Sequence, residues 1–527
     1  MGEPATLAEL IAALLIAVLL SACGGTPVRG EADVETRRFS GRITYDARQP
    51  TQQGTSEATE VRPARHVEVA VIGANGEVVS EGSADEDGVY TLEGPSDARA
   101  VRVSARVRVR GHDIAVARDA RGRETHTVDV PIEDPEAVSL HAQDQTGDGG
   151  AFHVVDTLLR GLDAATSWSG QTLPPVFVYW IRGGTREWSF YRGEQPAGSG
   201  RYALELLGGD PGQASISDTD EHDEAIILHE LGHFVMDRLS GDSSTGGMHP
   251  TGARIDPGLA WEEGRATWFA LAVLGEPLYQ DTIGVQPWGS LRVDAELESV
   301  PDEDDVVGLG SETTVSRVLW DLSDGGNSGL PDQDGDPVAL GPAPVLRAMI
   351  TQFQQSGSYA SLPSFLLHLV SEETVPRDTL AAMLTATGES PDALLPATLD
   401  EAWPRAVTPG MTLTGRIDGM TQPAPGGGMN LPQNGFAAIH TYRVHVEQTG
   451  MLMLRLSIQG TGRGADHQDL DLELLDLRAD RLADSRGETP QEAVGHLVQP
   501  GWYIARVRDG GRGNAADYRL EVLLETL

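Results

Sequence analysis

The stretch DEAIILHELGHFVMDRL, residues 223–239, carries two histidines and a glutamate at a spacing that permits metal chemistry. On an α-helix, residues four apart lie on the same side, so His229 and His233 can turn both imidazoles toward one ion. Glu230 projects about 100° round the helix, beside that ion, where its carboxylate can accept a proton. The spacing therefore predicts two ligands and a base of a metal site.

Two histidines do not complete such a site, because a catalytic zinc usually takes three protein ligands. The position six residues beyond His233 is Leu239, which excludes a third histidine there. A second segment with helical spacing, LAWEEGRATWFALAVLG, offers Glu262 and Glu263. Adjacent residues point about 100° apart on a helix, so only one of the two can face the metal.

HELGH followed at a distance by EGRA resembles the gluzincin family of zinc metallopeptidases, over about residues 150–400. The resemblance implies that Glu263 is the third ligand of Zn²⁺, beside His229 and His233. It also implies that Glu230 is the general base that activates a zinc-bound water, and that the substrate is a protein or peptide. Glu262 is then expected at the surface or next to the ligands.

Other residues are expected to support this site. Gly264 is expected to let the second helix approach the first closely, with Ala266, Thr267 and Ala270 packed between them. Some gluzincins place an aspartate where this chain has Thr267, so the contact that orients a histidine is expected to be weaker or to come from elsewhere. The strand in RYALELLG or ASISD is expected to be the edge strand that binds the substrate backbone.

Two further sets of residues, the candidate hydrogen-bond donors and the acids before the first helix of the site, each allow more than one interpretation. A donor to the charged reaction intermediate is needed, and its candidates are Tyr279, His249 and Arg317, for each of which a packing or loop role is the alternative. The acidic residues of DTDEHDEA, 218–225, fall near a helix start, where negative side chains interact favourably with the helix dipole.

The sequence DQDGD, from Asp332 to Asp336, has alternating acids and a glycine, as a calcium loop does. It lacks the bidentate glutamate that completes an EF-hand at the twelfth position, which favours an ordinary acidic turn over a calcium site. Calcium is therefore left open as a second cofactor.

Periodicity divides the chain into β-rich flanks and a mixed centre. Residues 39–140 alternate in HVEVAVIG and VRVSARVRVR, turn at Asn75-Gly76, and resemble a transthyretin-like or carboxypeptidase-regulatory β-sandwich. Residues 141–405 mix helical and strand patterns and are the predicted gluzincin-like peptidase domain. Residues 406–527, with DLDLELLD, PGWYIARV and YRLEV, resemble a bacterial pre-peptidase C-terminal β-sandwich. The predicted fold class is thus multidomain: an α+β zincin-like domain flanked by two β-sandwiches.

Composition narrows the classes of partner. The 527 residues include 39 basic and 79 acidic ones, for a formal charge of -40, which argues against nucleic acid as a partner. All basic residues are arginine, which excludes Schiff-base chemistry and a phosphate-loop lysine. One cysteine, Cys23, allows no intramolecular disulfide and no multi-cysteine metal site.

The N-terminus has the pattern of an export signal. An apolar run over residues 7–22 ends in LSAC, which resembles a bacterial lipobox, so residues 1–22 are predicted to be a signal peptide and residues 23–38 a tether. Lipid on Cys23 would anchor the protein to a membrane of the cell envelope; without lipid it would be secreted. The opening residues hold Glu3 and no arginine, which departs from the usual positive start of a signal.

These patterns favour an exported zinc metallopeptidase. The alternative is a catalytically silent surface-binding lipoprotein that works through its β-sandwiches. An intact set of His229, Glu230, His233 and Glu263 disfavours that alternative, because a protein without turnover has no need of the base.

Overall fold

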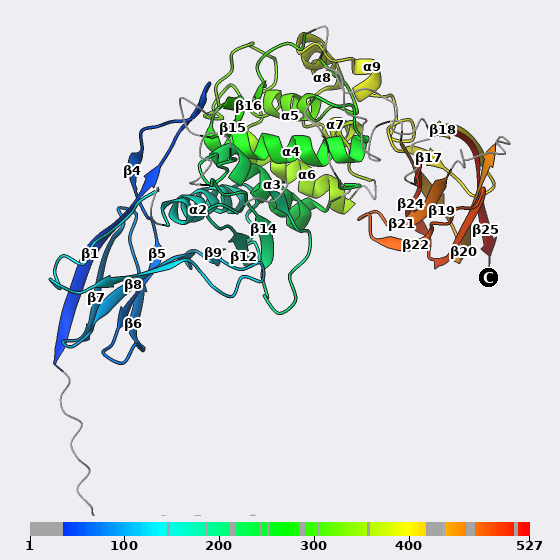
Figure 1. The fold of residues 1–527 in the computed structure, drawn as a ribbon. Coiled ribbons are helices and arrows are strands. Elements are labelled where there is room, and N and C mark those ends of the chain that lie inside the picture. Colours follow the sequence, from blue (N-terminus) through cyan, green and yellow to red (C-terminus); the bar gives the residue numbers. More distant parts are fainter. Residues whose placement is uncertain are drawn as a thin grey trace, which may run out of the picture.

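The chain folds into β-sheets at both ends and a helical middle (Figure 1). In this computed structural model the described residues are 35–144, 148–184, 188–210, 217–242, 244–247, 249, 252–284, 290–302, 305–355, 359–417, 436, 438–459, 469–510 and 515–526. The predicted signal peptide and Cys23 lie outside these ranges. The first strand already begins at Thr36, so the last residues of the predicted tether belong to a sheet.

Two sheets form the N-terminal part of the molecule. In the smaller sheet of four strands, β1 (Thr36–Ala47) pairs with each of the other three: β4 (Glu60–Pro63), β7 (Val89–Pro95) and β11 (Leu140–Ala142). The larger has the order β13-β14-β12-β9-β8-β5-β6, with β10 paired to β8. Its strands are β5 (Val67–Ile72), β6 (Val78–Ser83), β8 (Ala100–Val107), β9 (Ile114–Ala117), β10 (Thr127–Pro131), β12 (Val176–Tyr179), β13 (Phe190–Tyr191) and β14 (Tyr202–Glu205). A small hairpin joins β2 (Pro50–Thr51) to β3 (Gly54–Thr55).

The alternation seen in the sequence is realised in these strands. Along β8, Val101, Val103 and Ala105 are buried, while Arg102 and Ser104 between them are only partly buried. The hairpin between β5 and β6 turns where Asn75-Gly76 predicts it, and Gly76 has a φ of 91°, which glycine adopts without strain. Propensity and pattern therefore agree with the observed sheet.

The larger sheet crosses the predicted boundary after residue 140. Strand β12 pairs in parallel with both β9 and β14, so strands from the two sides of that boundary share one sheet. The buried residues of the N-terminal sheets and of the helical middle also belong to one continuous core. The division of the chain into domains stays a prediction, but the N-terminal sheets and the helices pack as neighbours without a linker.

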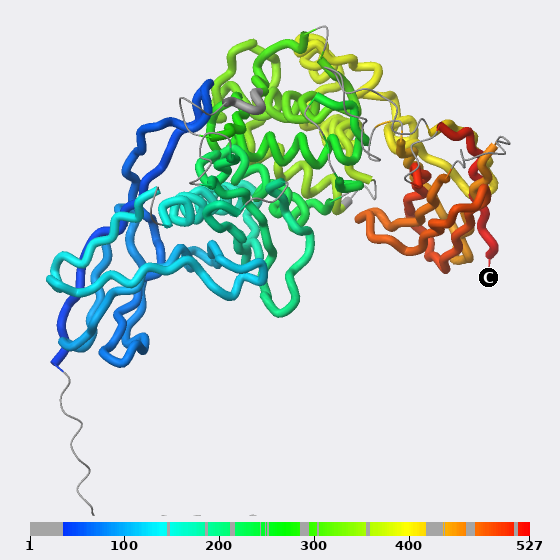
Figure 2. Tube along the Cα trace, in the orientation of Figure 1, coloured from blue at the N-terminus to red at the C-terminus, as the bar shows by residue number. Residues whose placement is uncertain are grey.

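The helices form the middle of the molecule, between the two β-rich ends (Figure 2). Helix α2 (Gly149–Ser169) packs between the larger sheet and α3 (Glu224–Ser240), and α3 packs against α4 (Pro257–Leu274), which packs against α5 (Glu312–Asp321). A β-hairpin, β15 (Leu278–Ile283) with β16 (Ser290–Glu296), follows α4. The remaining helices are α6 (Pro342–Gln355), α7 (Leu362–Ser371), α8 (Arg377–Ala386) and α9 (Pro391–Leu394).

The C-terminal part has a separate apolar core between two sheets. One sheet has the order β17-β19-β24-β21-β22 and the other the order β18-β25-β20-β23. Their bounds are β17 (Arg405–Val407), β18 (Thr412–Ile417), β19 (Ile439–Val446), β20 (Gly450–Gln459), β21 (Leu470–Leu475), β22 (Arg481–Ser485), β23 (Gln491–Val498), β24 (Gly501–Asp509) and β25 (Ala516–Thr526). The Arg506 side chain donates a 2.7 Å hydrogen bond to the Tyr359 hydroxyl and so joins this part to the middle.

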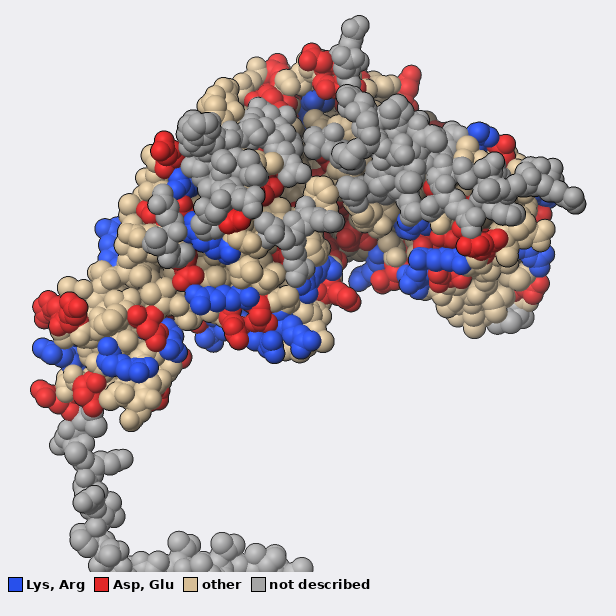
Figure 3. All heavy atoms as spheres, viewed as in Figure 1, with Lys and Arg blue, Asp and Glu red and all other residues tan. Residues whose placement is uncertain are grey.

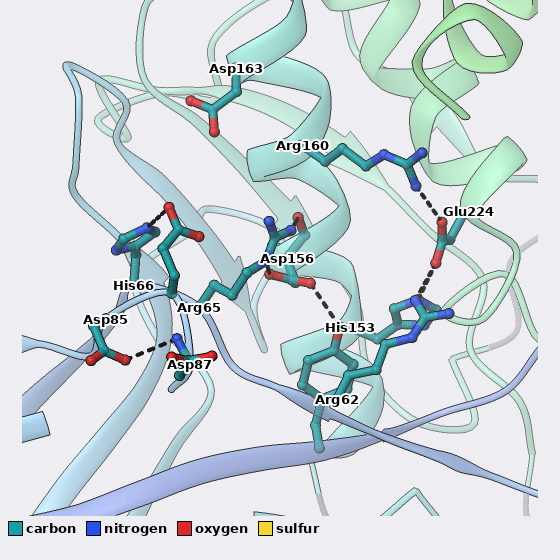
Figure 4. A network of polar contacts seen from close by, with 12 residues as sticks. Arg62, Arg65, His66, Asp85, Asp87, His153, Asp156, Arg160, Asp163 and Glu224 are labelled. Atoms are coloured by element: carbon teal, nitrogen blue, oxygen red, sulfur yellow. Dashed lines mark hydrogen bonds and ion pairs between the residues drawn. The ribbon is translucent and has the colours of Figure 1, made fainter. Parts of the chain in front are cut away.

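A network of ion pairs ties the N-terminal sheets to the start of α3 (Figure 4). Arg62 of β4 and Arg160 of α2 lie 2.5 and 3.2 Å from the Glu224 carboxylate, and His153 of α2 lies 3.2 Å from it. Beside them, Arg65 donates to Asp156 over 2.7 Å. The first turn of α3 is therefore held by cations from two other elements.

Charges of both signs are interspersed on the surface. On the face shown in Figure 3, arginines and acidic side chains lie side by side over both β-rich ends. Within the described residues, no helix has the length and apolar character needed to cross a membrane.

Candidate metal centre

Helices α3 and α4 approach each other closely at a glycine inside the HELGH motif. A Cβ on Gly232 would lie 2.9 Å from the Ala266 Cα and 3.0 Å from its carbonyl oxygen, so only glycine fits this crossing. Helix α4 has a well-defined start, because the Asp256 side chain accepts hydrogen bonds from the backbone N–H groups of Gly258 and Leu259. The two helices thus have a fixed separation at the residues that carry the predicted ligands.

The three predicted ligand side chains converge in this crossing. The His229 Nε2 and Glu263 Oε2 atoms are 3.2 Å apart, His233 Nε2 and Glu263 Oε2 are 3.1 Å apart, and the two Nε2 atoms are 3.1 Å apart. The three side chains are 11%, 16% and 7% exposed in the order His229, His233, Glu263. Two imidazoles and one carboxylate therefore share a single buried point.

This donor set fits zinc. Zinc holds imidazole nitrogens and carboxylate oxygens at about 2.0–2.2 Å in a tetrahedron, which places ligand atoms roughly 3.3–3.6 Å from one another. The observed separations of 3.1–3.2 Å are within a few tenths of an ångström of that range. Two histidines and one glutamate are also a set of three protein ligands that catalytic zinc sites use.

Thr267 orients one of the two histidines. Its hydroxyl oxygen lies 3.1 Å from the Nδ1 atom of His229, opposite the Nε2 atom that faces Glu263. A partner on the second nitrogen of an imidazole fixes its tautomer and ring orientation. Thr267 therefore makes the orienting contact to His229 with a hydroxyl group.

His249 and Glu312 hold the other side of Glu263. The Nε2 atom of His249 lies 3.2 Å from Glu263 Oε1, and its Nδ1 atom lies 3.4 Å from Glu312 Oε2, at the start of α5. Burial would raise the pKa of Glu263, but the nearby His249 and His233 lower it well below its ordinary value. The carboxylate thus has one oxygen facing the two histidine ligands and the other facing His249.

Glu312 was not predicted from the sequence, because nothing in the sequence indicates that α5 lies beside α4.

Glu230 lies buried next to the ligands. It is 7% exposed, and burial raises its pKa above the ordinary value of 4.5, against the opposing effect of His229 and His233. A raised pKa brings a carboxylate closer to the range in which it can both take up and release a proton. Its surroundings suit an acid–base residue.

The three candidate donors occupy different places. Tyr279 of β15 has its ring 6.1 Å, centroid to centroid, from the His229 ring. His249 contacts Glu263, as described. Arg317 lies 3.6 Å from Glu389, and its contact there is the structural alternative that the sequence left open. Tyr279 and His249 adjoin the ligands, and Arg317 pairs elsewhere.

One expectation about helix α4 was wrong, and one of the two alternatives given for Glu262 is excluded. Glu262 is not at the surface: it is 2% exposed and pairs with the equally buried Arg265. Gly264 does not face α3, because a Cβ there would lie 2.4 Å from the Val315 Cβ of α5. One residue beyond Glu263 the helix has turned by about 100°, so Gly264 faces α5. The close approach of α3 and α4 is made possible by Gly232 instead.

The acidic residues before α3 also differ from expectation. Asp223 occupies the N-cap position, but its side chain makes no capping bond and instead accepts from the backbone N–H and the hydroxyl of Thr282 on β15. Strand β14, a predicted substrate-binding edge, lies inside the larger sheet between β13 and β12, so its edges are already paired. The segment ASISD falls mostly outside the described residues.

Comparison with known families matches the part of the chain that holds this site. Residues 188–356 match the profile of the Mycolysin C-terminal domain, which is less than half of the chain and includes all four predicted site residues. The match and the His–His–Glu cluster together indicate a metallopeptidase.

The search of curated proteins gives no match. Among solved structures, the pre-peptidase C-terminal domain of collagenase from Bacillus anthracis is 13% identical, covers 22% of this chain and 91% of its own, and has a TM-score of 0.17. PliG of Aeromonas hydrophila, a periplasmic inhibitor of g-type lysozyme, is 15% identical, covers 23% of this chain and 97% of its own, and has a TM-score of 0.15. TM-scores of this size carry no structural argument.

Proposed function

We propose that the protein is a zinc-dependent metallopeptidase that hydrolyses peptide bonds. The observation that carries the proposal is the meeting of His229 Nε2, His233 Nε2 and Glu263 Oε2 within 3.2 Å of one another, from two helices. The match of residues 188–356 to the Mycolysin C-terminal domain supports it independently. Zinc bound there would act as a Lewis acid that acidifies water and polarises a carbonyl.

Glu230 is the proposed general base. Its buried carboxylate beside the ligands takes a proton from the attacking water and passes it to the leaving amine when the carbon–nitrogen bond breaks. Thr267 and His249 are positioning residues, because each contacts a ligand side chain and holds its orientation. The chain thus supplies proton transfer and a fixed ligand geometry.

Tyr279 is the proposed donor to the negative charge that develops on the carbonyl oxygen. Its ring lies beside His229, whereas His249 is engaged with two carboxylates. A donor of this kind contributes about 10²–10³-fold to kcat. Tyr279→Phe is expected to lower kcat by that order with zinc content and KM unchanged; an unchanged kcat would exclude Tyr279 from this role.

The flanking regions and the route of export complete the proposal. Residues 39–140 and 406–527 serve as β-sandwich modules, the second of the pre-peptidase C-terminal type, around a gluzincin-like domain of residues 141–405. Residues 1–22 serve as a signal peptide and Cys23 as the lipidated residue of a cell-envelope protein. Metabolic labelling with a radioactive fatty acid in a bacterial host, for wild type and Cys23→Ser, tests the anchor: equal labelling of the two proteins would rule it out.

The activity is tested with zinc content and casein cleavage, measured side by side for wild type and Glu230→Gln. The proposal predicts one equivalent of zinc in both proteins and cleavage by the wild type alone. A wild type that holds zinc and cleaves neither casein nor a peptide library would favour the silent surface-binding alternative. Cleavage that survives in Glu230→Gln would remove the assigned role of the base.

A further inference from the structure

A second group of carboxylates gathers where α5 ends, away from the His–His–Glu site. Oxygens of Glu298, Asp332 and Asp334 lie within 4.8 Å of one another, and the electrostatic interactions of this trio extend to three further aspartates. The group, called the acidic cluster below, comprises Glu298, Asp321, Asp324, Asp332, Asp334 and Asp336. Its members come from three segments: the residues after β16, the end of α5, and the loop before α6.

The acidic cluster contains buried carboxylate oxygens that accept no hydrogen bond. Asp321 and Asp324 are each 1% exposed. Neither oxygen of Asp324 accepts a hydrogen bond from any described residue, and the same holds for one oxygen each of Asp321 and Asp336. Buried polar groups are almost always hydrogen-bonded, and a buried charge without a partner is strongly destabilising. Asp324 therefore points to a missing positive partner.

The surroundings of Asp324 supply more negative charge. Its carboxyl group lies against that of Glu298, and burial together with this neighbour raises the pKa of Asp324 to about 9. Burial and the acids of the loop likewise raise the pKa of Asp321 to about 9, against the opposing effect of Arg317. Arg317 is engaged with Glu389 at 3.6 Å. The one contact with an acidic group that the structure gives Arg317 among the described residues is therefore with Glu389, outside the cluster.

The loop is arranged so that its acids are held in place. Backbone N–H groups of Gly335 and Val338 donate to one oxygen each of Asp332 and Asp336, at 2.7 and 2.6 Å. Glu298 accepts from the Trp320 indole at 2.7 Å and from the Gln333 backbone at 3.1 Å. These donors fix the carboxylates close together in spite of their mutual repulsion.

We propose that the acidic cluster is a calcium-binding site. Calcium takes six to eight oxygen ligands in a flexible geometry, and the carboxylates of Glu298, Asp332 and Asp334, whose oxygens lie within 4.8 Å of one another, would supply the first of them, beside the unpaired oxygens of Asp324. Magnesium prefers to keep several waters and few carboxylates, and zinc prefers nitrogen or sulfur ligands, neither of which the cluster offers. The proposal does not depend on the peptidase activity.

The loop sequence alone underrated this site. DQDGD lacks the glutamate that closes an EF-hand at the twelfth position, which favoured an ordinary turn. In the structure Glu298 brings its carboxylate within 4.8 Å of those of Asp332 and Asp334, and Asp324 lies against Glu298; Glu298 and Asp324 both lie N-terminal to the loop. When the ligands come from three separate segments, no short sequence motif contains them all.

Calcium here would join elements that lead to the metal centre. Helix α5 carries Asp321, and directly after it the Ser323 hydroxyl accepts a 2.9 Å hydrogen bond from the Trp268 indole of α4. Helix α4 also carries Glu263. We therefore expect bound calcium to stabilise the packing of α5 on α4 and to raise the unfolding temperature.

Terbium luminescence tests the site directly, since Tb³⁺ replaces Ca²⁺ and Trp320 lies one hydrogen bond from Glu298. The full chain, with zinc held constant, is excited at the tryptophan band. Wild type and the exposed control Asp378→Asn are expected to give a signal that Ca²⁺ displaces and equimolar Mg²⁺ does not. Asp324→Asn and the exposed-site variant Asp334→Asn are expected to bind Tb³⁺ at least tenfold more weakly.

Thermal unfolding gives a second, independent readout. Without Ca²⁺, Asp324→Asn removes a buried carboxyl group that must take up a proton on folding, and the variant is expected to unfold at a higher temperature than the wild type. With Ca²⁺ in excess, the wild type is expected to gain several degrees and to overtake the variant. A wild type whose unfolding temperature ignores Ca²⁺, or a variant that responds equally, would overturn the proposal.

Discussion

Two carboxylates in the helical middle, Glu224 partly buried and Asp324 fully buried, have opposite surroundings. Glu224, at the start of α3, accepts hydrogen bonds from Arg62 and Arg160 and contacts His153 (Figure 4). Asp324, after α5, accepts none from the described residues. The pKa of Glu224 is lowered to about 2 and that of Asp324 is raised to about 9. Burial acts in the same direction on both, so the difference comes from the partners.

This difference separates a structural ion pair from a site that awaits a ligand. Where the chain supplies its own cations, a carboxylate is stable as an anion and holds elements together. Where it supplies none, the same group destabilises the protein until a cation arrives. Glu263 lies between these cases, because His229, His233 and His249 surround it and a metal can replace part of their effect. Each of the following predictions changes one of these carboxylates or its support.

The largest effect is expected at Glu263. Glu263→Gln removes the anionic ligand, so we expect loss of the bound zinc and a fall in peptidase activity by at least about 10³-fold. Zinc content by atomic absorption and casein cleavage check this, with the exposed Glu276→Gln on the same segment as the charge-matched control. Full zinc content in Glu263→Gln would show that the cluster of three side chains is not the metal site.

A large loss of stability is expected at Gly232. A methyl group there meets the backbone of Ala266 at 2.9 Å, and backbone cannot move aside as a flexible side chain does. Gly232→Ala is expected to destabilise the fold by about 1–3 kcal/mol and to weaken zinc binding, because the two ligand-bearing helices are forced apart. Urea denaturation with and without zinc measures both effects. A variant as stable as the wild type would mean that the helices tolerate a wider crossing.

How much of this could be read from the sequence differs between the two kinds of site. His229, Glu230 and His233 were predicted from helical spacing, and Glu263 from the resemblance of EGRA to the gluzincin pattern, because four residues on two helices leave local patterns. Thr267 lies within the same pattern, and its contact with His229 appears only in the structure. Of the acidic cluster only the loop from Asp332 to Asp336 was visible in the sequence. Its other members and Glu312 could not be found, since they depend on how α4, α5 and distant loops pack.

The fold shows the same limit. Alternation predicted the strands of both β-rich ends, which are local features, and the hairpin at Asn75-Gly76. It did not predict that β12 would pair with β9 and so continue the N-terminal sheet into the middle. Pairing between distant strands depends on shared burial in one core, and the sequence of either strand does not carry that information.

A moderate effect is expected at Thr267. Thr267→Val keeps the size of the side chain but removes the hydroxyl that contacts His229 Nδ1, so zinc affinity is expected to fall by about 10–100-fold. Thr267→Ser restores the hydroxyl and is expected to recover most of the affinity. Competition with a chromophoric chelator measures the zinc dissociation constants. Equal affinities in the Val and Ser variants would show that the contact does not orient the ring.

The smallest effect is expected at Glu224 and depends on pH. Burial alone would raise its pKa, but the hydrogen bonds and charges of His153 and Arg62 lower it from 4.5 to about 2. A carboxylate whose pKa is lowered on folding stabilises the protein above its unfolded pKa, and this contribution is lost as the pH falls through the folded value. Glu224→Gln is therefore expected to cost about 2 kcal/mol of unfolding free energy at pH 6.

The difference between Glu224→Gln and wild type should shrink steadily between pH 4.5 and pH 2, because the wild type becomes protonated over that interval. Urea denaturation at pH 6, 5, 4 and 3 measures it, with Glu276→Gln as an exposed control that should show no such trend. A difference that stays constant with pH would mean that Glu224 contributes through packing or neutral hydrogen bonds. In that case the cations around Glu224 would not account for its difference from Asp324.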